Sequence, residues 1–159
     1  MLDYLRMQVE AGVDAVQLFD TWGGILHPSD YEAMVLPVVR RILDGLKHTG
    51  VPRIYFLKGS APYNHLVSTL DCECFGVDWT QDLTRAIAQL PGRCVQGNLD
   101  PLALYGSHEQ VRRRALAICR QGEAAPGHVF NLGHGILPKA PIPAVETLVR
   151  TVQEFRRGH

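Results

Sequence analysis

The sequence predicts an α/β protein made of about five consecutive strand–helix units. Segments with strand-like and helix-like patterns alternate along the whole chain of 159 residues. The expected strands are short and apolar throughout, which is typical of parallel strands covered on both faces. The most unusual turn sequences come directly after these strands. In a β/α barrel the loops after the strands share one face, and that face carries the active site.

The composition places the chain among globular proteins of one domain. Its residues are 46% hydrophobic and 20% charged, and Lys+Arg and Asp+Glu both number 16. This balance gives no positive field for a nucleic acid, and no apolar run reaches membrane-spanning length. The N-terminus lacks the hydrophobic stretch of a signal peptide, and the four cysteines lie in apolar surroundings, as reduced thiols do. We therefore expect a cytoplasmic protein without nucleic-acid or membrane partners.

The first unit is expected to begin inside a helix. Leu2, Leu5 and Val9 fall on one helical face, and Gly12 is suited to end the helix. The apolar segment Val13–Phe19 then predicts the first strand.

A long helix should come next. Ser29 and Glu32 have the spacing of a capping box, in which each side chain satisfies a free backbone donor at the helix start. We expect this helix to begin at Ser29, to run towards Lys47 and to stop near Gly50.

The middle of the chain has the pattern of three further units. The expected strands cover Arg53–Leu57, Cys74–Val77 and Arg93–Gln96. Short helices are expected over Asn64–Leu70 and Asp82–Leu90.

Two more helix starts are marked by capping residues. Asp100 precedes Pro101, which places a carboxylate at the cap and a proline where its missing N–H is harmless. Ser107, with a glutamine three residues later, has a second capping-box pattern and predicts a helix over Ser107–Gln121.

The last unit is predicted to combine a strand over His128–Leu132 with an amphipathic helix over Ile142–Phe155. Its apolar positions predict an inward face formed by Val145, Leu148, Val149 and Val152.

Five polar or glycine-rich loops follow the five predicted strands. They cover Asp20–Gly24, Lys58–Pro62, Asp78–Thr80, Gly97–Pro101 and Gly133–Gly135. A closed barrel needs eight strands and typically about 250 residues. Five strands would leave two open edges, so the sequence predicts part of a (β/α)8 TIM barrel rather than a whole one.

His134 is the most conspicuous side chain of these loops. It lies between Gly133 and Gly135, directly after an apolar strand segment. Glycine on both sides lets the backbone turn sharply and lets a ligand approach the imidazole. The sequence therefore indicates a binding or catalytic role for His134, with an ordinary loop histidine as the alternative.

The chain resembles the C-terminal half of uroporphyrinogen decarboxylase, a family of haem biosynthesis. Four segments are similar to family motifs, and they occur in the family's order: Ala11–Gly24, Gly76–Thr80, Gln96–Pro101 and Asn131–Gly135. The resemblance runs from end to end and implies that residues 1–159 are a partial barrel domain whose N-terminal half is absent.

The resemblance also implies an activity, that of a carboxy-lyase, a carbon–carbon lyase. The family converts the four acetate side chains of uroporphyrinogen III to methyl groups and gives coproporphyrinogen III, as a homodimer and without a cofactor or metal. In the family's mechanism a pyrrole carbon is protonated, carbon dioxide leaves, and a second protonation completes the methyl group.

Two of the family's substrate contacts map onto this sequence, Thr21 and His134. The family's arginine-rich substrate loop, its tyrosine contact and the aspartate that holds the pyrrole nitrogens belong to the other half, so no catalytic residue is assigned here. We therefore expect the 159 residues to be inactive alone.

Four other polar residues lie on the predicted loop face and have structural interpretations. Asp78 and Asp100 are expected to fix loop geometry or cap helices rather than to act as acid or base. Lys58 and Tyr63 could face an anionic ligand, but an exposed lysine and a loop tyrosine are common without a function.

Two rival functions stay open. The first is a non-catalytic remnant that binds a tetrapyrrole or another subunit. The second is a relative of zinc-dependent corrinoid methyltransferases, which share the decarboxylase fold and bind zinc through histidine and cysteine. Cys72 and Cys74 precede their strand, so they should lie at the opposite end from His134 and form no metal site with it.

Overall fold

The computed structural model describes residues 1–155 and contains one five-stranded parallel sheet. The strands are β1 (Val16–Asp20), β2 (Arg53–Leu57), β3 (Cys74–Gly76), β4 (Cys94–Gln96) and β5 (His128–Val129). They are neighbours in the order β1-β2-β3-β4-β5, and every pair is parallel. This order, in which each strand pairs with the next along the chain, is that of a β/α barrel. The α/β prediction is confirmed.

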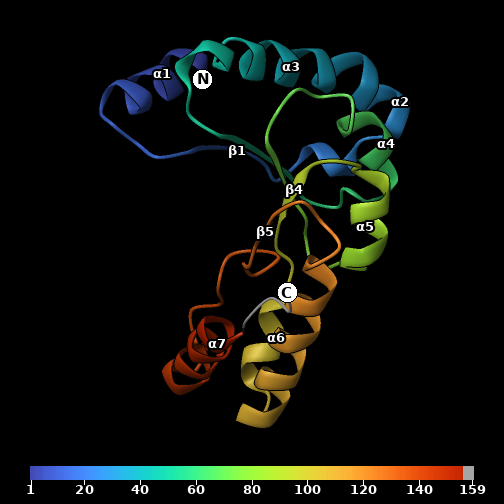
Figure 1. Cartoon of the computed structure of the whole chain (residues 1–159). Helices are drawn as coiled ribbons and strands as arrows, with labels where there is room; N and C mark the ends of the chain where they lie inside the picture. The colour runs from blue at the N-terminus through green and yellow to red at the C-terminus, as the bar shows by residue number, and fades with distance from the viewer. Residues whose placement is uncertain (156–159) are drawn as a thin grey trace.

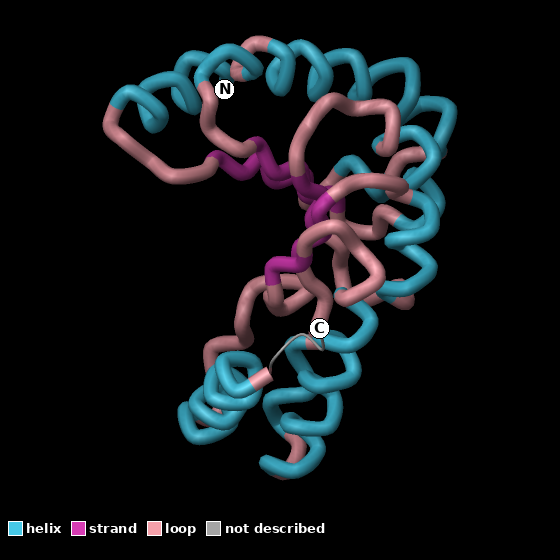
Figure 2. Tube along the Cα trace, in the orientation of Figure 1, coloured by secondary structure: helices cyan, strands magenta, loops and turns pink. Residues whose placement is uncertain are grey.

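Helices connect the strands. The α-helices are α1 (Leu2–Glu10), α2 (Pro28–Asp30), α3 (Leu36–Asp44), α4 (Asn64–Val67), α5 (Leu83–Gln89), α6 (His108–Gly122) and α7 (Ile142–Glu154). Figures 1 and 2 show the helices along the outer side of a curved sheet, with α1 and α7 at its two ends. The inner side of the strands carries no helix within residues 1–155 (Figure 2). None of the helices described is long and apolar enough to cross a membrane.

The strand register assigns each residue to the inner or outer side of the sheet. Leu18, Tyr55, Phe75 and Val95 are paired in one row, and most of this row is buried in the core beneath the helices. The neighbouring row is Phe19, Phe56, Gly76, Gln96 and Val129. Because successive side chains of a strand point to opposite faces, this second row faces the concave side.

The concave side is incompletely covered. Phe19 is 66% exposed and Val129 is 46% exposed, although both belong to strands. By contrast, a large cluster of buried side chains lies between the outer face of the sheet and helices α3, α4 and α5. The hydrophobic core of these residues therefore lies on the outer side of the curve.

The helix predicted to start at Ser29 begins one residue earlier, so the capping-box prediction for Ser29 and Glu32 was wrong. His27 is the N-cap, and its Nδ1 accepts a hydrogen bond from the backbone N–H of Ser29. Pro28 then occupies the first helical position, where a proline costs no hydrogen bond. The His27–Pro28 pair defines the start in place of the serine.

The same helix is not continuous up to Lys47. A wider π-helical turn covers Tyr31–Val35, and regular α-helix resumes at Leu36. Pro37 has no backbone N–H to donate to the preceding turn, so the regular hydrogen-bond pattern cannot run through it. A short 3-10 turn then ends at Gly50, which adopts a left-handed φ of 74°.

Other element boundaries differ by a few residues. The first strand starts at Val16 instead of Val13, and the fifth ends at Val129, with Leu132 forming a separate bridge to Leu99. Val149, predicted to face inward, is 47% exposed. The buried positions of α7 are Ala144, Leu148 and Thr151, whose spacing directs the neighbouring Val149 outward.

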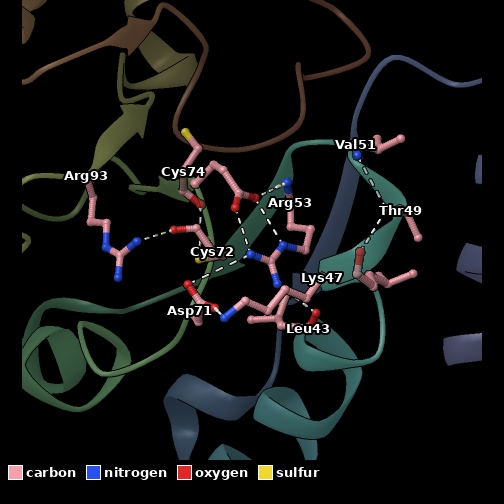
Figure 3. Close-up of polar contacts among 11 residues, drawn as sticks. Leu43, Lys47, Thr49, Val51, Arg53, Asp71, Cys72, Cys74 and Arg93 are labelled. Carbon is pink, nitrogen blue, oxygen red and sulfur yellow. Dashed lines mark hydrogen bonds and ion pairs between the residues drawn. The ribbon is translucent and has the colours of Figure 1, made fainter.

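Arg53 anchors the amino-terminal end of the sheet (Figure 3). Its guanidinium donates to Glu73 through Nε (3.1 Å) and Nη2 (2.7 Å), and Nη1 donates to the carbonyl of Leu43 (2.9 Å). The side chain of Arg53 is only 4% exposed, while that of Glu73 is 50% exposed. Asp71 lies 3.9 Å from the same guanidinium and pairs with Lys47 at 2.7 Å. These contacts join α3, β2 and the segment before β3.

Glu73→Gln is expected to lower the free energy of unfolding by about 1.5 kcal/mol, because the buried Arg53 guanidinium exchanges a charged bidentate partner for one neutral amide oxygen. Urea unfolding followed by circular dichroism measures this. Glu154→Gln is the matched control, since its pair with Arg112 is 56% exposed on both sides, and a change below about 0.5 kcal/mol is expected there. Equal effects of the two substitutions would contradict a structural role for the Arg53 pair.

The same pair makes stability depend on acid pH. The hydrogen bond from Arg53 lowers the pKa of Glu73 below its ordinary value. A carboxyl with a lowered pKa stabilises the fold above its unfolded pKa, and this stability is lost as the pH falls through the folded pKa. In the Glu73→Gln variant the free energy of unfolding should therefore fall less than in wild type as the pH is lowered.

Candidate functional site

A cavity of about 460 Å³ opens on the concave side, where the strands end. Its wall includes Gln17, Phe19, Thr21, Phe56, Gln96 and His134. Thr21 follows β1 and His134 follows β5, the two edge strands of the sheet. The two site residues predicted from the sequence therefore lie in one cavity, although 113 positions separate them along the chain.

The imidazole of His134 is oriented by contacts on both sides. Its Nδ1 accepts a hydrogen bond from the backbone N–H of Gly135 at 2.6 Å. A neutral ring whose Nδ1 is an acceptor carries its proton on Nε2. The rings of Trp79 and Phe56 meet it edge-on, with centroids 5.5 and 6.5 Å away. His134 can therefore present an Nε2–H donor to a ligand.

The two glycines beside His134 have different roles. A Cβ on Gly133 would lie 2.3 Å from the backbone nitrogen of Trp79, closer than any side chain allows. A Cβ on Gly135 would meet no atom within 4 Å. The backbone N–H of Gly133 also donates to the carbonyl of Leu99 at 2.8 Å. Of the two glycines beside His134, only Gly133 is required by the close packing of the loops after β3, β4 and β5.

Thr21 lies next to a loop that is fixed by its neighbour Asp20. The carboxylate of Asp20 accepts from the N–H of Gly23 (2.6 Å) and from the hydroxyl of Tyr55 (3.0 Å). Tyr55 in turn accepts from Tyr31, with 2.6 Å between the two hydroxyls. Burial raises the pKa of Tyr31 to about 12 and that of Tyr55 further, so both stay protonated donors. The hydroxyl of Thr21 makes no hydrogen bond to any residue of 1–155.

Asp78 and Asp100 have the structural roles that the sequence predicts. Asp78 is fully buried and accepts from the N–H of Gly59 and from both the N–H (2.7 Å) and hydroxyl (2.5 Å) of Thr80. Asp100 caps the turn after it through the N–H of Leu102 at 2.9 Å. Both carboxylates are therefore used in holding the loops.

Tyr63 and Lys58 lie outside the wall of the cavity. Tyr63 is buried, and its hydroxyl donates to the carbonyls of Gly24 and Leu26. It therefore holds the loop after β1. The amino group of Lys58 lies 5.8 Å from the centre of the Trp79 ring, a cation–π contact.

Comparisons with known proteins give the family of the chain. The family described as "Uroporphyrinogen decarboxylase (URO-D)" matches residues 1–155. A uroporphyrinogen decarboxylase from Syntrophotalea carbinolica is 48% identical over 156 residues, which are 98% of this chain and 46% of the relative. One from Pelobacter propionicus is 41% identical and covers 99% of this chain and 46% of its own length.

The chain belongs to the uroporphyrinogen decarboxylase family. It spans about half the length of the curated relatives it matches. A solved methyltransferase from Methanosarcina mazei superposes with a TM-score of 0.84 at 18% identity, covering 96% of this chain and 45% of that chain. At this identity the likeness shows the fold, and the half-coverage agrees with a partial barrel.

Two polar residues of the cavity wall, Gln17 and Gln96, were not predicted from the sequence. Both lie inside strands, and the sequence prediction looked for site residues in the loops after strands. Gln17 lies two positions before Phe19 and four before Thr21. The period-2 alternation of a strand places Gln17 and Phe19 on one face, and this signal could have identified Gln17.

Cys72 and Cys74 lie away from His134. Cys74 begins β3 and Cys72 precedes it, so both lie at the opposite end of the strand from the cavity, as predicted. All four cysteines are free thiols, and burial raises the pKa of Cys72 to about 12. Among residues 1–155 no three histidine, cysteine or acidic side chains converge as a metal site would require.

Proposed function

We propose that these residues form one side of the substrate cavity of a uroporphyrinogen decarboxylase. The reaction converts the four acetate side chains of uroporphyrinogen III to methyl groups and gives coproporphyrinogen III. For each acetate, the bond between the side-chain CH₂ and the carboxylate breaks, carbon dioxide leaves, and a proton takes its place. The observation that carries the proposal is that Thr21 and His134, the two mapped substrate contacts, line the same cavity.

The chemistry of the cavity suits a polycarboxylate macrocycle. The hydroxyl of Thr21 and the Nε2–H of His134 are donors for carboxylate oxygens, and donors held in place by a protein cost little reorganisation when a ligand binds. Phe19 and Phe56 are neighbouring aromatic walls, with ring centroids 5.8 Å apart. They offer apolar surface to the pyrrole rings. These residues therefore bind and orient the substrate.

We further propose that residues 1–159 are part of a larger barrel domain, and that the remaining strands are supplied in the same or another polypeptide. The open edges at β1 and β5 and the exposed inner side chains Phe19 and Val129 support this proposal. As a cytoplasmic homodimer the completed domain would carry out the reaction without a cofactor. The 159 residues alone should bind substrate without turning it over.

Binding of the substrate to the purified chain tests the proposed function. We expect isothermal titration calorimetry with uroporphyrinogen III, kept reduced under anaerobic conditions, to show saturable binding. Thr21→Val should weaken this binding by roughly 10-fold, because a donor to a charged acceptor is lost. A folded chain that shows no saturable binding would contradict the proposed function.

A further inference from the structure

Two glutamines connect strands that are not neighbours. Gln17 lies on β1 and Gln96 on β4, with β2 and β3 between them in the sheet. Nevertheless, Nε2 of Gln96 donates to Oε1 of Gln17 at 3.1 Å. The two side chains therefore meet across the concave side of the sheet.

One atom of this pair has an unused hydrogen-bonding capacity. Nε2 of Gln17 is buried and has no partner among residues 1–155. A buried amide donor without a partner is unfavourable, and such groups call for an explanation. Exchanging the O and N atoms of both carboxamides would keep the mutual hydrogen bond. It would make Gln17 the donor of the pair and place its Oε1, an acceptor, at the buried position. In the orientation of the structure Gln96 is the donor, and the Nε2 of Gln17 has no partner among residues 1–155.

Gln17, the residue that holds the free donor, lines the candidate cavity. Gln17 and Gln96 line this cavity together with Thr21 and His134. Phe19 follows Gln17 on the same face of β1, and Thr21, directly after the strand, lines the same cavity. The wall thus brings the two glutamines together with the hydroxyl-bearing Thr21 and the imidazole-bearing His134.

We propose that the Gln17–Gln96 pair is a substrate-recognition element, in which the carboxamide of Gln17 donates a hydrogen bond to a carboxylate of the bound tetrapyrrole. The bond from Gln96 holds the carboxamide of Gln17 in the orientation that presents its N–H. This inference rests on the proposed function and adds a specificity-determining residue to it. The carboxylate is that of an acetate or of a propionate side chain.

Two substitutions at Gln17 separate recognition from a structural role. Gln17→Met removes the donor and the bond to Gln96. Gln17→Glu removes the donor but keeps an acceptor for Gln96, and it adds a negative charge facing the ligand. If Gln17 recognises a carboxylate, binding should decrease from wild type to Gln17→Met and further to Gln17→Glu. If Gln17 only supports Gln96, the glutamate variant should bind better than the methionine variant.

The measurement is calorimetric titration of the chain with anaerobic uroporphyrinogen III. We expect Gln17→Met to weaken binding by about 10-fold and Gln17→Glu by about 100-fold, as the loss of a charge-assisted hydrogen bond and added repulsion imply. The exposed Gln153 on α7 gives the matched control, and Gln153→Glu should bind as wild type does. Circular dichroism confirms that each variant is folded.

A second ligand identifies the side chain that Gln17 recognises. Coproporphyrinogen III retains the propionates and has methyl groups in place of the acetates. Weaker binding of both ligands by the Gln17 variants assigns the contact to a propionate, and weaker binding of uroporphyrinogen III alone assigns it to an acetate.

The outcomes separate this inference from the proposed function. Suppose that the wild-type chain binds the substrate, that Thr21→Val weakens this binding, and that the Gln17 variants bind as wild type does. This result would overturn the proposed role of Gln17 and leave the proposed function standing. The reversed order of the two Gln17 variants would do the same. Failure of the folded wild-type chain to bind would overturn both proposals.

Discussion

Gly133→Ala is expected to weaken binding of uroporphyrinogen III to the chain by roughly 10- to 100-fold, because the hydrogen bond from His134 to a charged carboxylate is lost. The added methyl group would lie 2.3 Å from the backbone nitrogen of Trp79 and 2.8 Å from its Cβ. Neither atom can move without shifting the loop after β3. The segment that carries His134 must therefore move away from the cavity wall.

Gly135→Ala is the matched control for that experiment. It adds the same methyl group on the other side of His134, where no atom lies within 4 Å. Its binding should stay within about twofold of wild type, since surface substitutions away from special features change little. Calorimetry with reduced uroporphyrinogen III measures both variants. Equal binding by the two alanine variants would show that the contact between Gly133 and Trp79 does not position His134.

His134→Asn is expected to lower kcat/KM by roughly 10- to 100-fold, the range for losing a hydrogen bond to a charged group. The measurement uses a chimera in which these 159 residues replace the matching segment of the Syntrophotalea carbinolica relative. The shorter asparagine loses both the Nε2–H donor and the ring contacts with Trp79 and Phe56. Coproporphyrinogen formation is followed anaerobically by chromatography of the oxidised products.

His48→Asn controls for a histidine change elsewhere in the same chimera. His48 is exposed and lies before β2, at the opposite end of the strands from the cavity. The His48→Asn chimera should have the same activity as the parent chimera. If His134→Asn also retained full activity, His134 would not be a substrate contact.

The sequence predicted the order of the elements well because the pattern of each element is local. The capping box at Ser107 is present as predicted, with its side chain accepting from the N–H of Gln110 and the Gln110 side chain accepting in return. The same pattern failed at Ser29, because Pro28 already fits the first helical turn and His27 can cap it. The proline beside Ser29 therefore explains why one of the two capping-box patterns forms and the other does not.

The site was predicted in part. Thr21 and His134 were found from their positions after strands and from the family resemblance, and the structure places both on one cavity. Whether they bind the substrate stays a prediction. Gln17 and Gln96 were not found. Their contact depends on how strongly the sheet curves between β1 and β4, and no local sequence pattern specifies this curvature. The unequal roles of Gly133 and Gly135 likewise depend on how closely the Trp79 loop packs.

The central claim is that these residues form one side of a working decarboxylase cavity. Turnover of uroporphyrinogen III by the chimera tests it most directly, with the isolated 159-residue chain assayed beside it. We expect the chimera to release carbon dioxide and accumulate coproporphyrinogen III without added metal or coenzyme, while the isolated chain forms no product. A folded chimera that leaves all four acetates intact would contradict the claim.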